Sequence, residues 1–406
     1  MPVRLSTARL STARLSTAQA AARLGVKPAT LYSYVSRGLI SSERITDSVG
    51  STFDPMEVET LAHNRRARSS SPVAGSPLMV LDSSITLIRS DELFYRGVPA
   101  ARLAMVSSFE EVTALVWEAG SDLVFAPFDE VAQLIRGSPL DGARPVDLFL
   151  HTLLLSAVHD PVKWDLTTPT VWTLASRAIA TMVAALPGET VPSGSSIASA
   201  LWSKLSPLPG SSGDRKLLNA ALVLLIDHDL AASTLAARVA ASARAHPYAA
   251  LTSAFGAFDS ALHGHASSQA AAMLNEVIAT GNTEAAISRQ LAEGKGIPGF
   301  GHVLYQERDP RSDVLLSLMR TMPRYREVTQ AADRLTAVVT SRTHRMPNID
   351  LALAALTIGG RMHPTAGQGI FGLARCVGWT AHILEEYSES PLRLRPAGNY
   401  VGVMPT

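Results

Sequence analysis

From residue 98 onward, apolar residues recur at helical spacing almost to the end of the chain, and this pattern limits the fold more than any other feature. The interruptions are short and rich in Gly, Pro and Ser, as in DGARP, VPSGSS, SPLPGSSGD, EGKGIPGFGH and RMPN. Aromatic residues make up only 6% of the sequence, while Ala, Leu and Ser dominate, a mixture that favours helices packed on helices. Before this region, LMVLDSSITLI (78–88) predicts one or two short strands. We therefore predict a mainly α-helical body, and 406 residues predict two or three domains.

The charge of the chain is unevenly distributed. Residues 1–70 contain ten Lys and Arg against five Asp and Glu, a net charge of +5. The whole chain carries +1, so the remainder carries −4. A small basic unit joined to a mildly acidic body predicts separate functions for the two parts.

Three copies of RLSTA open the chain, at residues 4–8, 9–13 and 14–18. A period of five does not match the helical turn, so the repeated arginines would not share one helix face. We predict that residues 1–15 form a disordered extension. A basic arm that touches DNA phosphates is the alternative.

The next stretch, residues 16–66, carries the signals of two short helices joined by a turn. Ser16 or Thr17 can cap the first helix, and Gly25 supplies the turn. Pro28 suits the first position of the second helix, which stops at the glycine of SRGL. The remaining residues, ISSERITDSVGSTFDPMEVETLAHNRR, predict a hairpin wing and a third helix. Two short helices around a glycine turn are typical of helix-turn-helix geometry.

This stretch resembles the DNA-binding module of MerR-type regulators, most of all in TLYSYVSRGLI (30–40). The resemblance implies a winged helix-turn-helix, and the net charge supports a modest contribution from phosphate contacts. A module of the same shape that binds a protein is the alternative. ARSSSPVAGSP (67–77) is rich in Ser, Pro and Gly and predicts a linker. The residues expected to contact DNA are Lys27, Thr30, Tyr32 and Arg37.

Several classes of protein are disfavoured by what the sequence lacks. The single cysteine, Cys376, excludes an internal disulfide, and without a Cys/His cluster a structural zinc site is not expected. No apolar run approaches the ~18 residues that span a bilayer. Arg4, Arg9 and Arg14 interrupt any apolar core of a signal peptide. We expect a cytoplasmic protein with no metal and no membrane partner.

Clusters of polar residues in the back half are candidates for chemistry. Taken singly they are ambiguous, since a His in an apolar setting is more often a core residue than a catalyst. Asp350 can simply cap a helix, Arg311 can be an exposed turn residue, and the pair His263/His265 has no third metal ligand nearby in sequence. The GFGH segment predicts a tight loop whose backbone N–H groups suit an anionic ligand. The clusters are IDHDLAAST (226–234), SALHGHASSQ (260–269), GIPGFGHVLYQERDPRSD (296–313), MPNIDLAL (346–353) and FGLARCVGWTAHILEEYSESPLRLRPAGNYVG (371–402).

Together, the order, spacing and residue identities of these clusters resemble those of the citrate synthase family over residues 78–406. LDSSIT…LFYRGVPAARLAMVSSFEEVTALVWEAG matches the family's opening, DHDLAASTLAARVAAS its DHE-type segment, and LHGHA stands in place of an LHGGA-like motif. GFGHVLYQERDPR, PNID and FGLAR…GWTAHILEEYSESPLRLRP follow in the family's order. The resemblance implies a large helical domain (78–263 and 361–406) and a small domain (264–360) that closes over it.

The resemblance also implies condensation of acetyl-CoA with oxaloacetate and water to give citrate and CoA. Removing a proton from a thioester methyl group needs a positioned base and a donor for the enol oxygen. The family gives Asp350 the role of base, His263 that of enol stabiliser, and His302 the polarisation of the oxaloacetate ketone. No separate cofactor is implied, because acyl-CoA is a substrate. The loop expected to place N–H groups against acyl-CoA contains Gly299, Phe300 and Gly301.

Oxaloacetate is a small dianion, so its site needs several fixed cations, and arginine forks supply both charge and orientation. The family's arginines map onto Arg311, Arg375 and Arg395. The last would reach the neighbouring subunit's site, which implies a homodimer. His228 would hold the substrate from another side, and Phe371 would pack beside Arg375. Without the resemblance, Arg375 and Arg395 are expected to pair with acids on a helix surface.

Two alternatives stay open. Propionyl-CoA would give 2-methylcitrate, since one methylene changes binding by only ~1–3 kcal/mol in an apolar pocket. A transcription regulator whose synthase-like body senses oxaloacetate, citrate or acyl-CoA is the other, although the intact catalytic set favours turnover. The chain departs from the family at His265, where a small or apolar residue is common, at Leu351, where an aromatic is common, and at Asp229, which replaces glutamate. These departures leave the acyl preference open.

Overall fold

A computed structural model describes residues 14–44, 51–68, 80–120, 123–140, 142–189, 192, 194–261, 263–292 and 296–404. Most of the predicted extension and of the predicted linker lies outside these residues. For the few residues of these two segments that the structure describes, both predictions are wrong. Leu15 is buried in a strand that pairs with Phe53, and residues 67–68 continue a helix instead of starting a linker.

The N-terminal module, residues 14–68, has its own small core around a three-stranded antiparallel sheet of order β1-β3-β2. The Ser16 hydroxyl caps α1, Gly25 ends it with a φ of +64°, and Pro28 begins α2, as predicted. Leu31 and Phe53 are among the side chains of the shared core. The elements are β1 (Leu15–Ser16), α1 (Thr17–Leu24), α2 (Pro28–Ser36), β2 (Ser42–Arg44), β3 (Ser51–Phe53) and α3 (Pro55–Arg68).

A second small sheet opens the body of the molecule. It is antiparallel in the order β4-β5-β6, with β4 (Thr86–Arg89), β5 (Glu92–Tyr95) and β6 (Val98–Pro99). The stretch 78–88 therefore supplies one strand, and its partner follows after a tight turn. The Tyr95 hydroxyl is buried and donates to the carbonyl of Asp227 at 3.3 Å, which ties the sheet to the helical core.

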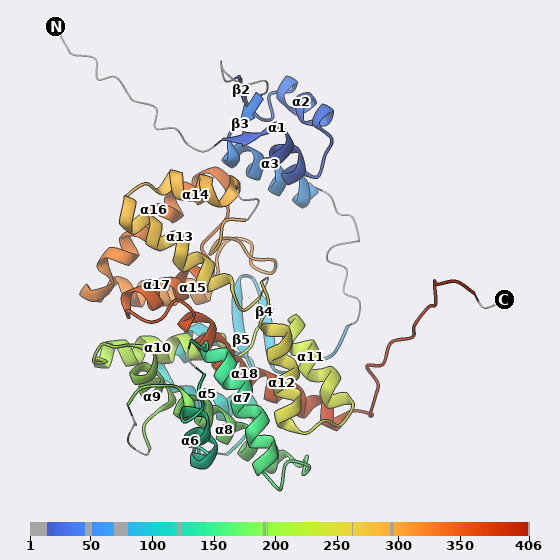
Figure 1. The fold of residues 1–406 in the computed structure, drawn as a ribbon, viewed down its shortest axis with the longest axis vertical. Helices are drawn as coiled ribbons and strands as arrows, with labels where there is room; N and C mark the ends of the chain where they lie inside the picture. The colour runs from blue at the N-terminus through green and yellow to red at the C-terminus, as the bar shows by residue number, and fades with distance from the viewer. Residues whose placement is uncertain are drawn as a thin grey trace.

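The rest of the body is helical, in agreement with the predicted fold class. Figure 1 shows one group of helices beneath the module and a larger group below it. The first group is α13 (Ala266–Thr280), α14 (Thr283–Ala292), α15 (Pro310–Arg320), the 3₁₀ turn η1 (Pro323–Tyr325), α16 (Arg326–Thr343) and α17 (Ile349–Gly359). The second is α4 (Ala100–Val106), α5 (Phe109–Trp117), α6 (Asp129–Arg136), α7 (Pro145–His159), α8 (Thr168–Ala185), α9 (Ile197–Leu205), α10 (Ser212–Leu225), α11 (Ala232–Ser242), α12 (Pro247–Phe258) and α18 (Ala366–Ser388).

One continuous cluster of buried side chains joins the two groups, so the division at residues 264 and 360 stays a prediction. In the part of the chain that the structure describes, no helix is both long and apolar enough to cross a membrane.

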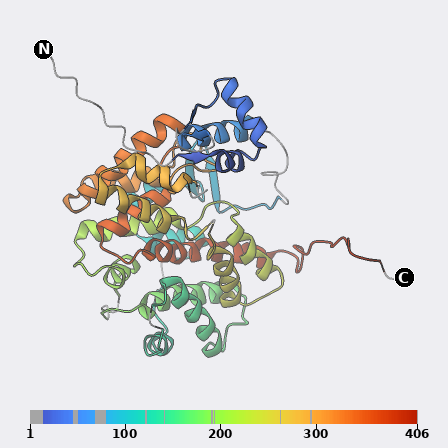
Figure 2. The same cartoon turned by 45° about the horizontal axis from the view of Figure 1, so that its top comes forward.

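Helix α18 runs through the middle of the body (Figure 2) and is buried along almost its whole length. Small residues let neighbouring chain segments approach it closely. A methyl group at Gly378 would lie 2.3 Å from the carbonyl oxygen of Ile226, and one at Gly372 would lie 2.8 Å from the ring of Phe255. This close packing fixes α18 against the turn that follows α10, where the candidate site begins.

Candidate active site

Helix α18 carries two of the predicted site residues one turn apart. The guanidinium of Arg375 lies 4.8 Å from the centroid of the Phe371 ring, and its Nε donates to the carbonyl of Leu225 at 2.9 Å. Arg375 is buried and makes no ion pair within the described residues. A buried arginine with N–H groups that make no ion pair is suited to hold a carboxylate.

His228 lies in the turn after α10 and is buried. Its Nε2 is 3.0 Å from the Tyr305 hydroxyl, and its ring contacts the ring of His302 at 4.9 Å between centroids. Burial and the charge of Arg311 lower the pKa of His228 well below its ordinary value of 6.5. The imidazole is therefore neutral at pH 7 and acts through hydrogen bonds.

His302 is the last residue of the GFGH loop and is half-buried. Its Nδ1 lies 3.0 Å from the N–H of Leu304, which can only donate, so Nδ1 accepts. In the neutral ring the proton then resides on Nε2, where it can be donated to a substrate oxygen. Burial, helped by the charge of Arg311, lowers the pKa of His302 to about 4 and keeps the ring neutral.

His263 precedes α13 and lies against the rings of Phe258 and Phe371, at 5.1 and 5.7 Å between centroids. Its Nε2 is 2.8 Å from the Ser233 hydroxyl, which also accepts from the indole N–H of Trp379 at 3.3 Å. In the tautomer whose Nε2 accepts from this hydroxyl, the neutral ring carries its proton on Nδ1. Burial and then the charge of Arg375 lower the pKa of His263 to about 4.

Asp350 is the second residue of α17. It does not cap the helix, because the Asn348 side chain takes that role by accepting from the Asp350 N–H at 3.0 Å. Burial raises the pKa of the Asp350 carboxyl to about 7, and the charge of Arg311 opposes the rise only in part. A carboxyl with a pKa near 7 suits a general base that works at neutral pH.

Arg311 is buried and forms a two-pronged pair with Asp309, through bonds of 2.9 and 2.8 Å. The same carboxylate accepts from the N–H of Ile349 at 3.0 Å. Asp309 therefore ties the first turn of α15 to the first turn of α17, which carries Asp350. The Arg311 guanidinium also lies over the Tyr305 ring, 5.4 Å from its centroid.

Sequence reasoning missed three of these residues as members of the site: Tyr305, Asp309 and Ser233. Each stands inside one of the clusters quoted above. Tyr305 is three residues after His302, Asp309 comes just before a proline, and Ser233 follows DHDLAA. No spacing rule pairs Tyr305 with His228, because that contact is made only when two distant segments meet.

The GFGH loop is tight, as predicted, with φ values of +83° at Gly299 and +82° at Gly301. One part of the prediction is wrong. The Gly301 N–H donates to the carbonyl of Met346 at 2.8 Å, so it is not available to acyl-CoA in this structure. A second backbone hydrogen bond joins the same two segments, because the Asn348 N–H donates to the Gly299 carbonyl at 2.9 Å. Beside the loop, a cavity of about 670 Å³ lies between residues 300–309 and 344–348.

Other predicted residues lie elsewhere. Arg395 is exposed on the segment after α18, which runs away from the body (Figure 1), and its side chain has no polar partner in the described part of the chain. His265 turns to Asp259 instead of the site, with Nε2 2.8 Å from the carboxylate. The predicted DNA contacts lie on the module: Lys27, Tyr32 and Arg37 are exposed and Thr30 is half-buried.

Ring contacts and charge effects link seven of the predicted residues, and the roles assigned to them stay predictions. They are His228, His263, His302, Arg311, Asp350, Phe371 and Arg375. Two buried cations, three neutral imidazoles and one carboxyl of raised pKa can hold a small dianion and move a proton beside it. Among the described residues, no group of three or more His, Cys, Asp and Glu is placed to bind a metal ion.

The chain is similar to known proteins over most of its length. The family described as citrate synthase, C-terminal domain, matches residues 76–397. The chain is 34% identical to citrate synthase 2 of Bacillus subtilis over 187 residues, which is 45% of this chain and 50% of that protein. It is 27% identical to the 2-methylcitrate synthase of Mycobacterium tuberculosis over 347 residues, 77% of this chain and 86% of that protein.

The fold also matches solved structures. The ternary complex of the citrate synthase of Thermoplasma acidophilum with carboxymethyl coenzyme A and oxaloacetate aligns with a TM-score of 0.68 at 23% identity. The match covers 81% of this chain and 95% of that one.

Proposed function

The chain belongs to the citrate synthase family, and from that premise we propose that it condenses acetyl-CoA with oxaloacetate and water to give citrate and free CoA. The proposal rests on Asp350, whose pKa is raised to about 7 and which feels the charge of Arg311, together with two neutral imidazoles, one near Arg311 and one near Arg375. Each of these groups matches one requirement of the reaction.

In the first step Asp350 takes a proton from the methyl group of the thioester. The negative charge that develops on the thioester oxygen is stabilised by the Nδ1–H of His263. A neutral donor suits this task, because its pKa is closer to that of the enol than an imidazolium's would be.

In the second step the enol carbon attacks the ketone carbon of oxaloacetate and a C–C bond forms. His302 donates a hydrogen bond from Nε2 to the ketone oxygen and stabilises the alkoxide that forms. The proton that Asp350 accepted balances the one that this oxygen takes up to become the hydroxyl of the product. Arg311, Arg375 and His228 hold the carboxylates of oxaloacetate and fix the face that is attacked. Water then cleaves the thioester, and CoA leaves as its thiol.

The reaction is tested by following free thiol after acetyl-CoA and oxaloacetate are mixed with the protein. We expect release that requires both substrates, and a loss of at least ~10³-fold in kcat for Asp350→Asn, because an amide cannot accept the proton. Release that persists in Asp350→Asn would remove Asp350 from the role of base. No release with acetyl-CoA or propionyl-CoA would refute the enzyme proposal.

Propionyl-CoA is the alternative substrate, and a 2-methylcitrate synthase is among the relatives. Comparing kcat/KM for the two thioesters under the same conditions decides the preference. A higher value for propionyl-CoA would make 2-methylcitrate the main product.

We also propose that the active form is a homodimer in which Arg395 of the partner subunit completes the site. Large apolar side chains are exposed on α7, on the loop after it and on α11, which supports a covered face. They are Leu154, Val158, Val162, Trp164, Leu235 and Val239.

DNA binding by the N-terminal module is a second candidate function. Helix α2 buries only Leu31 and lies on the side of the module away from the body, whereas α3 faces the body (Figure 1). Its exposed Lys27, Tyr32 and Arg37 are therefore accessible to DNA. Binding to the protein's own promoter region should be sequence-selective and should weaken with salt. Equal affinity for unrelated DNA would count against a regulator.

A further inference from the structure

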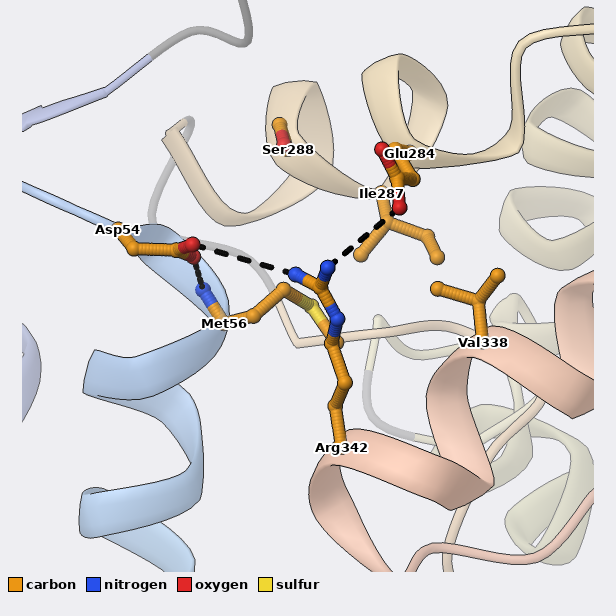
Figure 3. A pocket seen from close by; sticks show the side chains of 7 residues that line it. All are labelled: Asp54, Met56, Glu284, Ile287, Ser288, Val338 and Arg342. Carbon is orange, nitrogen blue, oxygen red and sulfur yellow. Dashed lines mark hydrogen bonds and ion pairs between the residues drawn. The ribbon is translucent and has the colours of Figure 1, made fainter.

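The N-terminal module is docked on the body through α3. The Thr60 hydroxyl donates to the carbonyl of Arg342, near the end of α16, at 2.7 Å. The Arg342 guanidinium lies between Asp54 of the module and Glu284 of α14, at 3.9 and 3.4 Å (Figure 3). Met56 enters the small pocket between them. The contact therefore joins charged and apolar groups of both parts.

A second ion pair in this interface is more deeply buried. Glu59 of α3 is only 1% exposed and is shared between two arginines. Its Oε2 accepts from the Nε of Arg23, within the module, at 2.7 Å. Its Oε1 lies 2.7 Å from the Nη2 of Arg345, in the body. That oxygen makes no aligned hydrogen bond, so Arg345 is held mainly by charge and is the more easily exchanged partner.

Arg345 also belongs to the candidate active site. It lines the cavity of about 670 Å³ together with Gly301 and His302. A methyl group at Gly301 would lie 3.5 Å from the Cδ of Arg345, so the side chain passes along the GFGH loop. The next residue, Met346, accepts the hydrogen bond from the Gly301 N–H. One arginine thus contacts both the module and the loop that carries His302.

We infer that Arg345 binds a phosphate group of CoA, and that Glu59 of the module competes with that phosphate for its guanidinium. The inference rests on the proposed function, because it takes acyl-CoA as the occupant of the cavity. Arginine binds phosphate through paired N–H groups, and the Nη2 that would take part lies against Glu59 in this structure. The docked module therefore weakens CoA binding, and by reciprocity CoA loosens the docking of α3.

The test measures CoA binding by calorimetry in four proteins: wild type, Glu59→Gln, Arg345→Gln and the double variant. Glu59→Gln keeps the shape of the side chain but removes its charge, so we expect CoA to bind about fivefold tighter or more. Arg345→Gln should weaken CoA binding by about tenfold, since it removes a phosphate ligand. In the Arg345→Gln background, Glu59→Gln should not change CoA affinity, because the guanidinium for which Glu59 and the phosphate compete is gone.

Glu43→Gln is the matched control. Glu43 is an exposed glutamate of the same module that pairs with Arg14 and, among the described residues, with no group of the body, so CoA affinity should equal that of the wild type. Thermal melts check that each variant folds. A direct reading of docking comes from amide exchange in α3, which should become faster when CoA is added to the wild type but not to Arg345→Gln.

The outcomes separate this inference from the proposed function. If the wild type binds CoA and Glu59→Gln binds it equally or more weakly, Glu59 only holds the interface together and the competition is refuted. If the wild type binds no CoA at all, the inference and the acyl-CoA proposal fail together. Loss of the effect with 3′-dephospho-CoA would assign the contact to the 3′-phosphate, whereas an unchanged effect would assign it to the diphosphate.

Discussion

Burial raises the pKa of Asp350 to about 7 and lowers the pKa of His263 and of His302 to about 4. The same cause acts in opposite directions because burial disfavours the charged form, which is the carboxylate in one case and the imidazolium in the other. At neutral pH Asp350 is thus close to half ionised while His263 and His302 are neutral. This is the protonation state that the proposed condensation requires.

The raised pKa of Asp350 has a consequence for stability. Above pH 7 the carboxylate is ionised in both the folded and the unfolded chain, and burial penalises the folded one; below about pH 4 both are neutral and the penalty vanishes. Asp350→Asn should therefore increase the free energy of unfolding at pH 8 by about 2–4 kcal/mol, at ~1.4 kcal/mol per pKa unit, and the gain should fade as the pH drops from 7 to 4. Urea unfolding at both pH values measures it. A gain of equal size at pH 4 and pH 8 would contradict this explanation.

At the scale of helices and strands, local signals predicted the structure well. The Ser16 cap, the turn at Gly25 and Pro28 at the start of α2 each act within a few residues, and the structure places all three as predicted. The exact ends of helices and strands were harder to predict from local signals. Leu15 joins a strand because β3 lies beside it, and that neighbour comes more than thirty positions later in the chain. Contacts of this range have no local signature.

The packing of α18 on the turn after α10 gives a prediction about a single methyl group. In Gly378→Ala the added carbon would lie 2.3 Å from the Ile226 carbonyl oxygen and 2.6 Å from the Asp227 carboxylate, so the turn that carries His228 must move. We expect a loss of about 1–3 kcal/mol in stability and a higher KM for oxaloacetate. Thermal melts and steady-state kinetics measure these effects.

Gly256→Ala, in the exposed face of α12, is the control for that substitution. Apart from the adjoining residues and the helix's own backbone, no described atom lies within 4 Å of the added methyl group, so alanine should stabilise the helix by up to about 1 kcal/mol without changing KM. If Gly378→Ala behaved in the same way, the close contact between α18 and the turn would not position His228.

At the scale of the whole molecule, the sequence indicated which parts exist but not how they meet. The charge difference separated a basic module from the body, and the ordered clusters predicted which residues gather in the site. The ion pair between Glu59 and Arg345 could not be predicted, because it joins residues 286 positions apart and no spacing rule links the RMPN segment to α3. Such a contact depends on the shape of both surfaces, which periodicity and spacing do not encode.

The proposed dimer makes the last prediction. If each site combines Asp350 of one subunit with Arg395 of the partner subunit, then Asp350→Asn and Arg395→Gln are each inactive alone, but a mixed dimer keeps one site with both native residues. Subunits mixed in equal amounts, unfolded and refolded together should recover about a quarter of wild-type activity, because half of the dimers are mixed and each has one working site. Recovery requires exchange, so mixing the folded variants briefly should give less. Full activity of Arg395→Gln alone, or a monomer in sedimentation that still turns over, would show that Arg395 has no role across the interface.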